Sequence, residues 1–141
     1  MLLVFSHRLS EEQEADAEKN YAISEFVEMP AEIAKIWANI PPEPESILDN
    51  LNPILDWIKN NAQQGDYVIV QGDYGATYAV VKFCFDNGFI PVYATTKRIV
   101  EETVLPDGST KTTHIFKHIR FRQYQNLSGV PERDFTVRSV L

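Results

Sequence analysis

The fold is decided by the stretch Gly65-Asp-Tyr-Val-Ile-Val-Gln-Gly-Asp-Tyr-Gly75, an apolar run to Phe85, and Ile90-Pro-Val-Tyr-Ala-Thr-Thr96. An aliphatic run that ends in a glycine turn is typical of a strand buried on both faces. The residues after this turn recur at helical spacing, and Asp73 can cap the helix. Asn87-Gly88 is a helix-stop signal. The stretch predicts a strand–helix–strand unit, in which ligands gather at the carboxyl ends of the strands.

The composition is that of an ordinary globular protein. A chain of 141 residues fits one domain, residues 1–141, and no apolar run approaches the roughly 20 residues of a membrane span. Met1–Phe5 lacks a basic segment before it and is expected to be a strand rather than a signal peptide. The lone cysteine, Cys84, excludes an intrachain disulfide and fits a reducing cytoplasm. Its apolar helical context favours a core residue over a nucleophile.

The charge is distributed unevenly. The net charge of −7 argues against binding of long nucleic acid. Residues 1–66 hold 13 acidic and 4 basic residues, a net charge of −9, whereas residues 67–141 hold 7 and 9, a net charge of +2. No acidic residue lies between His114 and Tyr124, where there are three cations. This distribution suits a local basic pocket for a small anionic ligand.

The residues before the central unit also predict alternating strands and helices. The expected segments are a strand at Leu2–Phe5, a helix after the capping box Ser10–Gln13, a strand at Tyr21–Val27, a helix opening at Pro30, and a helix at Ser46–Ala62 restarted or kinked at Pro53. With the central unit they give a β-α-β-α-β-α-β core over residues 1–96.

Residues 97–141 change character. Arg98–Leu105 and Thr110–Tyr124 flank the turn residues Pro106–Ser109, which is a hairpin signal, and a last short strand is expected at Phe135–Val140. The predicted fold class is therefore α/β. Its architecture is a Rossmann-like, mainly parallel sheet flanked by helices, with a C-terminal antiparallel hairpin.

Three polar segments are expected at the carboxyl ends of the parallel strands: Ser6-His7-Arg8, Gln71-Gly72-Asp73-Tyr74-Gly75 and Thr95-Thr96-Lys97-Arg98. A histidine at such an edge can act as a general acid or base or contact an anion, or it can be a loop residue bonded to backbone. A glycine turn at a helix N-terminus lets amides approach an anion. It matches neither GxGxxG nor a Walker A loop, so neither NAD nor ATP is indicated.

The second strand of the hairpin carries a basic pattern. Alternation places His118, Arg120, Arg122 and Tyr124 on one face, spaced about 6–7 Å apart, comparable to successive phosphates of an extended nucleotide chain. The face is either a phosphate grip or a solvated surface. No metal or other cofactor is expected, because His114 and His118 would lie about 13 Å apart on a strand. There is no G-x-S-x-G elbow.

Together these elements resemble a known family. The relevant fragments are Val4–His7, Trp37 with Ile40-Pro-Pro42, Gln71–Thr77, Tyr93–Thr96 and Phe116–Arg122. In order and spacing they are similar to the small stand-alone CRISPR-associated proteins of the Csx group, Csx-twenty type. The resemblance implies a fold like the CRISPR-associated Rossmann (CARF) domains and the activity of a ring nuclease. Such enzymes degrade cyclic oligoadenylate, chiefly cyclic tetraadenylate, the second messenger of type III CRISPR immunity, and work as homodimers.

The resemblance also implies roles for residues. Metal-free ring nucleases align a ribose 2′-hydroxyl with its own phosphate, so the protein needs only to orient groups and stabilise charge. The matching positions are Ser6 and His7 after the first strand and Thr96, Lys97 and Arg98 after the fourth. Arg98 or Lys97 would stabilise charge, and His7 would orient or protonate. Gln71, Gly72 and Tyr74 would line the floor, and His118, Arg120 and Arg122 would grip phosphate or close over the ring.

Two alternatives remain open at this point. The same pocket could bind the messenger without cleaving it, as a sponge or sensor. Without the resemblance, the pattern indicates a doubly wound nucleotide-binding domain of unknown ligand. The hairpin could equally be a dimer interface or a lid.

Overall fold

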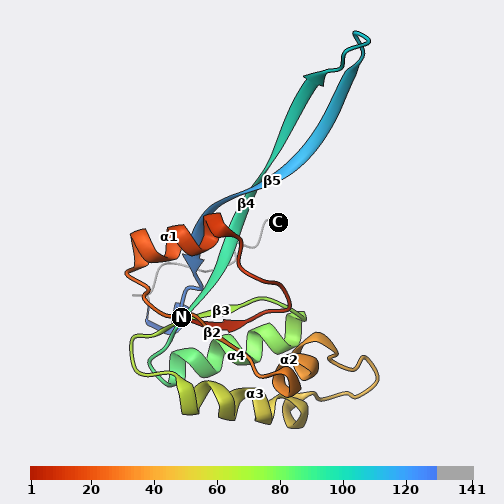
Figure 1. Ribbon diagram of the computed structural model, residues 1–141. Helices are drawn as coiled ribbons and strands as arrows, with labels where there is room; N and C mark the ends of the chain where they lie inside the picture. Colours follow the sequence, from red (N-terminus) through yellow and green to blue (C-terminus); the bar gives the residue numbers. More distant parts are fainter. Residues whose placement is uncertain (130–141) are drawn as a thin grey trace, which may run out of the picture.

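The computed structural model describes residues 1–129 and contains five strands in one sheet (Figure 1). The strands are β1 (Leu2–Val4), β2 (Val27–Glu28), β3 (Tyr67–Val70), β4 (Ile90–Val104) and β5 (Thr110–Gln123). Their order is β2-β1-β3-β4-β5; the first four run parallel and β5 is antiparallel to β4. The prediction of a mainly parallel α/β sheet extended by an antiparallel hairpin is confirmed. The predicted strand Phe135–Val140 lies outside the described residues.

Helices cover both faces of this sheet. They are α1 (Glu11–Tyr21), α2 (Ala31–Ala38), α3 (Leu48–Asn61) and α4 (Tyr74–Asp86), with a short 3₁₀ turn at Leu127–Gly129. One face packs on α1 alone, and the other on α2, α3 and α4. None of the helices in the described part of the chain combines the length and apolar character needed to span a membrane.

Alternate residues of the short strands pack into two hydrophobic cores, one on each face of the sheet. Val68 and Val70 of β3 pack toward α3 and α4, whereas Ile69 points to the α1 side. All three are fully buried, as the aliphatic run before Gly72 predicts. Cys84 lies in the larger core, and burial raises the pKa of its thiol to about 12, so it is an inert core residue as expected.

The predicted helix signals are largely confirmed. Ser10 and Gln13 form the reciprocal capping box of α1, and the Asp73 carboxylate caps α4 by accepting from the Ala76 amide at 3.0 Å. Gly88 follows α4 with a φ of 76°, a left-handed conformation that favours glycine. These local signals therefore fix where α1 and α4 begin and where α4 ends.

Three predicted boundaries are wrong. Helix α1 continues to Tyr21, and β2 comprises only Val27–Glu28, because the Tyr21 side chain packs in the core from the helix. Helix α3 runs through Pro53 without a restart, although Pro53 lacks the N–H that would bond to the Asp49 carbonyl one turn earlier. Strand β4 does not end at Thr96 but continues to Val104, because β5 pairs with it along its whole outer length.

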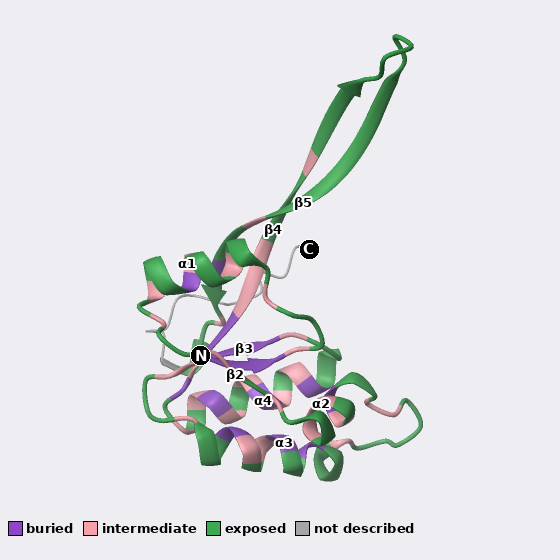
Figure 2. Cartoon of the chain, viewed as in Figure 1, coloured by how far each residue is buried: buried purple, intermediate pink, exposed green. Residues whose placement is uncertain are grey.

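The outer parts of β4 and β5 form a ribbon that projects from the body of the molecule (Figure 1). We define the ribbon as residues 96–118. Almost all of it is exposed, in contrast to the inner ends of the same strands (Figure 2). The hairpin turn at residues 106–109 is confirmed, with Gly108 at a φ of 83°.

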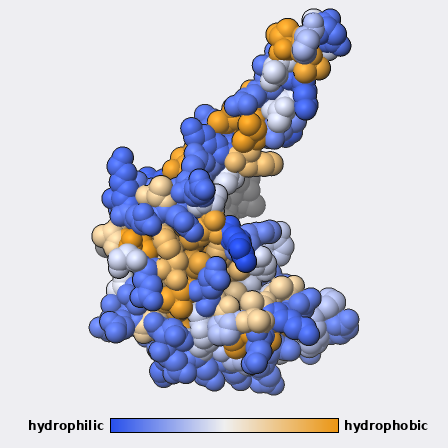
Figure 3. Space-filling model, viewed as in Figure 1, coloured by the Kyte–Doolittle hydropathy of each residue, from blue (hydrophilic) through white to orange (hydrophobic). Residues whose placement is uncertain are grey.

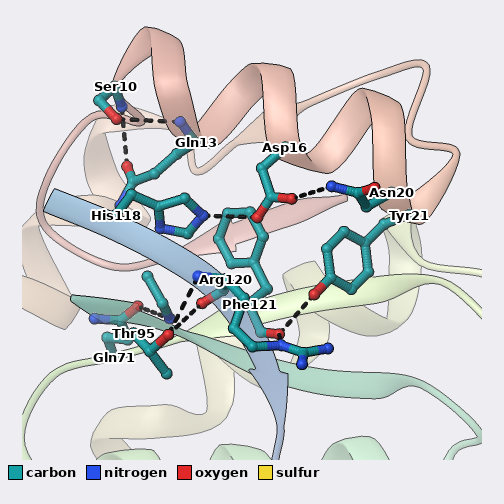
Figure 4. A network of polar contacts seen from close by, with 11 residues as sticks. Ser10, Gln13, Asp16, Asn20, Tyr21, Gln71, Thr95, His118, Arg120 and Phe121 are labelled. Atoms are coloured by element: carbon teal, nitrogen blue, oxygen red, sulfur yellow. Dashed lines mark hydrogen bonds and ion pairs between the residues drawn. The ribbon is translucent and has the colours of Figure 1, made fainter. Parts of the chain in front are cut away.

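A bulge at the base of the ribbon overturns the predicted alternation of β5. Thr95 pairs with Arg120 and Thr96 pairs with His118, so Ile119 is an extra residue. The bulge moves His118 onto the α1 face, away from Arg122 and Tyr124. There its Nε2 lies 2.7 Å from the Asp16 carboxylate of α1, and its ring packs on Phe121 (Figure 4). The four residues do not share one face.

Asp16 thus anchors the ribbon to α1. Partial burial raises the pKa of its carboxyl, but hydrogen bonds with Asn20 and His118 and the charges of His118 and Arg120 outweigh burial, so the pKa lies below its ordinary value of 3.8. A carboxyl whose pKa is lowered by folding stabilises the native state above its unfolded pKa, and this contribution disappears as the pH falls through the folded value. We expect Asp16→Asn to lower the free energy of unfolding at neutral pH by about 1 kcal/mol and to flatten its decline below pH ~4.

The measurement is urea denaturation over a pH series. Asp86→Asn is the matched control, because Asp86 forms an exposed pair with Lys82 and should change stability by less than about 0.5 kcal/mol. An Asp16→Asn protein with the acid-side slope of the wild type would show that the anchor is not a titrating contact.

Candidate functional site

The strand order places a topological switch point between β1 and β3. The chain leaves β1 through α1 on one face of the sheet and reaches β3 through α2 and α3 on the other. In open α/β sheets, the crevice outside the carboxyl ends of such strands is the usual ligand site. The segments there are Ser6-His7-Arg8 after β1 and Gln71-Gly72-Asp73 after β3.

The first hollow at this edge, the β1 hollow, has a volume of about 460 Å³. Its polar lining includes Ser6, His7 and Arg8, with Lys35 of α2 and one acidic residue, Glu28. The His7 ring packs edge-on against Phe5 at 6.5 Å between centroids, while Ser6, His7 and Arg8 are all exposed. Two cations and a histidine facing one carboxylate make this hollow suited to an anion.

The second hollow, the tyrosine hollow, lies beyond the ends of β3 and β4 and has a volume of about 470 Å³. It is lined by Gln71, Gly72, Tyr74, Thr77, Tyr93 and Tyr124. The Tyr74 residue in the first turn of α4 is 95% exposed, an unusual position for so large a ring. The Thr77 hydroxyl is buried and has no partner among the described residues. Flat aromatic faces beside an unused hydroxyl suit a planar, polar ring such as a nucleobase.

Two of these tyrosines are held rigidly. The Tyr124 hydroxyl donates to the Val70 carbonyl at 2.7 Å, and its ring lies 4.8 Å from that of Tyr93. Burial and the nearby Tyr93 raise the pKa of Tyr124, so the phenol keeps the proton that it donates. The Arg122 guanidinium lies over the Tyr93 ring at 5.7 Å and donates to its hydroxyl at 3.2 Å. Arg122 therefore holds a positive charge at the rim of the hollow.

Gln71 joins the elements that form this edge. Its backbone N–H donates to the Val4 carbonyl of β1 at 3.1 Å, and its backbone carbonyl accepts from the Trp37 indole of α2 at 3.0 Å. Its side-chain Oε1 accepts from the Ala94 amide of β4 at 2.9 Å. Gln71 was predicted as a ligand contact; the structure shows that much of its bonding capacity is used to hold the edge together.

The glycine turn has a packing role. A Cβ at Gly72 would lie 2.8 Å from the buried Trp37 ring, so the indole explains the glycine without a ligand. The Asp73 carboxylate bonds to the first turn of α4, where it would repel an anion. These contacts argue against the expectation that the N-terminus of α4 binds a phosphate. Gly75 has an ordinary helical position beside Ile47.

The residues predicted at the end of the fourth strand lie elsewhere. Because β4 continues to Val104, Lys97 and Arg98 are exposed residues of the ribbon and line neither hollow. Thr96 lies beside the bulge. The Thr95 hydroxyl donates a hydrogen bond to the Arg120 backbone carbonyl and accepts one from the Arg120 backbone N–H. The structure thus brings Ser6, His7 and Arg8 to the same sheet edge as Gln71–Tyr74, but not the cations of β4.

The cations of β5 are likewise divided. Arg120 lines a separate hollow with Asp16, Asn20 and Tyr21 of α1 (Figure 4). The His118 side chain is 5% exposed and engaged with Asp16. Only Arg122 reaches the rim of the tyrosine hollow. His118, Arg120 and Arg122, which were predicted to share one basic face, therefore lie in three separate environments.

Sequence reasoning missed several residues of the two hollows. Lys35 reaches the β1 hollow because α2 packs beside the end of β1, a relation between distant segments that no local motif signals. Tyr93 and Tyr124 meet only because β4 pairs with β5, although a search for aromatics at predicted strand ends would have flagged Tyr93. Within residues 1–129, no three His, Cys, Asp or Glu side chains are grouped closely enough to hold a metal ion.

The Gly72–Trp37 contact makes a direct prediction. Gly72→Ala should lower the free energy of unfolding by about 1–3 kcal/mol, because the added methyl group overlaps a buried ring. Gly75→Ala is the matched control: its Cβ meets only ordinary contacts, and alanine favours a helix, so stability should rise by about 0.5–1 kcal/mol. Chemical denaturation of both proteins decides the matter, and equal effects would refute the packing role.

Comparison with known proteins places the chain in a family. Residues 1–122 match the family described as "Uncharacterized protein MJ1673 family". A relative from Methanocaldococcus jannaschii, "Uncharacterized protein MJ1673", is 45% identical over 124 residues, covering 88% of this chain and 95% of the relative. No solved structure matches the chain significantly. The family match includes every residue that lines the two hollows except Tyr124, and nearly all of the hairpin, and on this basis the chain belongs to the MJ1673 family.

Proposed function

We propose that this protein is a ring nuclease that degrades cyclic oligoadenylate, most readily cyclic tetraadenylate, and so switches off type III CRISPR signalling. The proposal includes a CARF-like Rossmann fold and a homodimer, which follow from the sequence resemblance, and a cytoplasmic location, which the lone cysteine favours. The strand order and the switch point are compatible with such a fold.

One observation carries the proposal. The carboxyl edge of the sheet holds two hollows at the ends of neighbouring strands, one lined by cations and a histidine and the other by tyrosine rings. A chain of nucleotides offers the complementary pair of groups, phosphates and planar bases, at short repeated intervals. Arg122, at the rim of the tyrosine hollow, adds a charge that can contact a phosphate.

The reaction needs little from the protein. The 2′-oxygen of a ribose forms a bond to the adjacent phosphorus, and the bond from phosphorus to the 5′-oxygen breaks. The proton of the 2′-hydroxyl goes to a base, and the leaving 5′-oxygen receives a proton. The products are a 2′,3′-cyclic phosphate and a free 5′-hydroxyl. His7 is the candidate to transfer one of these protons, with Ser6 orienting the ribose or phosphate.

The residues that would stabilise the negative charge of the phosphorane differ from those predicted from the sequence. In one chain, Arg98 and Lys97 lie on the ribbon and line neither hollow, so Arg8 and Lys35 are the cations next to His7. Both side chains are exposed, and no hydrogen bond or ion pair within the described residues holds either in place, whereas preorganised charge is what usually accelerates such reactions. This feature favours the second candidate, a binding protein that sequesters the messenger without cleaving it.

The test is incubation of the purified protein with cyclic tetraadenylate in EDTA, followed by chromatography. The proposal predicts linear diadenylate ending in a 2′,3′-cyclic phosphate. An intact ring that stays tightly bound would instead show that the protein sequesters the messenger without cleaving it. His7→Ala should slow cleavage by about 10²- to 10⁴-fold while affinity changes by less than tenfold. Equal losses of rate and affinity would reduce His7 to a contact residue.

Two lysines provide a matched pair for the binding measurement. Lys35 and Lys59 both lie in the last turn of a helix, but only Lys35 lines the β1 hollow. Lys35→Ala should weaken binding of cyclic tetraadenylate about tenfold, and Lys59→Ala should leave it unchanged. If neither cleavage nor binding of the ring is observed, the proposed function is wrong.

A further inference from the structure

The ribbon exposes apolar side chains that the rest of the described chain does not cover. Val104 is 74% exposed and Phe116 70%, and Val100 and Ile115 are also exposed. Orange patches mark the ribbon and its tip in Figure 3. A two-stranded ribbon alone in water is marginally stable, and clustered exposed apolar residues mark interaction sites. The ribbon therefore has the character of a surface that is covered by a partner.

The register of β4 and β5 assigns these side chains to two faces. Beyond the bulge, Arg98 pairs with Phe116, Val100 with His114, and Val104 with Thr110, so their side chains share one face. We call this the Phe116 face; its main members are Arg98, Val100, Glu102, Val104, His114 and Phe116. The opposite face carries Lys97 and Lys117 as a directly opposed pair.

The charge of the outer ribbon argues against nucleic acid as the occupant. Residues 99–115 contain three acidic residues, Glu101, Glu102 and Asp107, and one basic residue, Lys111. A ribbon that follows a phosphate backbone places cations along its length, whereas here all the cations except Lys111 lie at the base. A protein surface with apolar and mixed-charge character is the better complement.

The Phe116 face is complementary to itself. Arg98 and Glu102 lie two residues on either side of Val100, each about 6–7 Å away along β4. When two copies of this face stack in antiparallel fashion about a two-fold axis through Val100, Arg98 of each copy lies opposite Glu102 of the other. Val100 then meets its own copy, and the Phe116 rings are covered. A two-fold contact of this kind needs such reciprocal pairing.

We infer that the ribbon is an arm through which two copies of this chain associate, Phe116 face against Phe116 face, with reciprocal Arg98–Glu102 ion pairs. The inference specifies a surface for the homodimer of the proposed function, but it does not depend on any ligand. Association is measured without cyclic oligoadenylate, so failure here and failure of the ring-nuclease proposal are distinguishable.

The test is sedimentation velocity on the full chain and on two charge-reversal variants. Arg98→Glu places Glu against Glu102, and Glu102→Arg places Arg against Arg98, so each variant alone should dimerise about tenfold or more weakly than the wild type. In an equimolar mixture both pairs are again of opposite sign, and the mixture should form a heterodimer with nearly wild-type affinity. Because Arg98 and Glu102 are both exposed, circular dichroism should show unchanged folding.

The opposite face supplies the matched control. Lys97→Glu and Glu101→Arg have the same spacing and chemistry, and neither should change association, alone or mixed. A wild-type chain that remains monomeric overturns the inference, as does a mixture of the Phe116-face variants that fails to associate. Retention of single-stranded RNA by a monomeric wild type, lost in Arg98→Glu, would also overturn it and identify nucleic acid as the occupant.

Discussion

The hydrogen bonds of Gln71 are the constraint on which the functional edge depends. Strand β3 ends at Val70, and without a further partner its neighbours would separate there. The Gln71 backbone continues the pairing with β1 and receives the Trp37 indole, while its side chain substitutes for a strand bond to β4. One residue thus fixes the positions of two strands and a helix at the point where the chain switches faces. Gln71 also lines the tyrosine hollow, and the β1 hollow lies at the end of β1, the strand to which its backbone bonds.

The molecule combines this rigid edge with a long extension. The body is acidic, with a strongly negative first half, and the cations concentrate where the hairpin leaves the sheet. The bulge at Ile119 turns His118 toward α1, and its contact with Asp16 fixes the base of the ribbon against the body. Beyond that contact the ribbon has only its own cross-strand bonds within the described chain. Its exposed apolar residues are therefore not covered by any other part of residues 1–129.

Much of the fold was predictable from local patterns, and much of the site was not. The buried run before Gly72, the Ser10 capping box and the Pro106–Ser109 turn each specify their structure through nearby residues, and all three were identified. The end of β4 was misplaced because pairing with β5, not local propensity, keeps residues 97–104 extended. The bulge at Ile119 has no sequence signature, so one inserted residue reversed the predicted face of His118. Lys35 and Tyr124 reach the hollows only because distant segments are brought together, whereas Tyr93 lies near a predicted strand end and could have been identified.

The central claim is that the ligand lies across the carboxyl ends of β1 and β3. An amide-resolved NMR titration with cyclic tetraadenylate tests it most directly, because every loop at that edge has backbone amides to report. The account predicts saturable shifts at Ser6–Arg8, at Gln71–Tyr74 and near Tyr93. Shifts confined to the outer surfaces of α1 or α3, or an unchanged spectrum at saturating ring concentration, would contradict it.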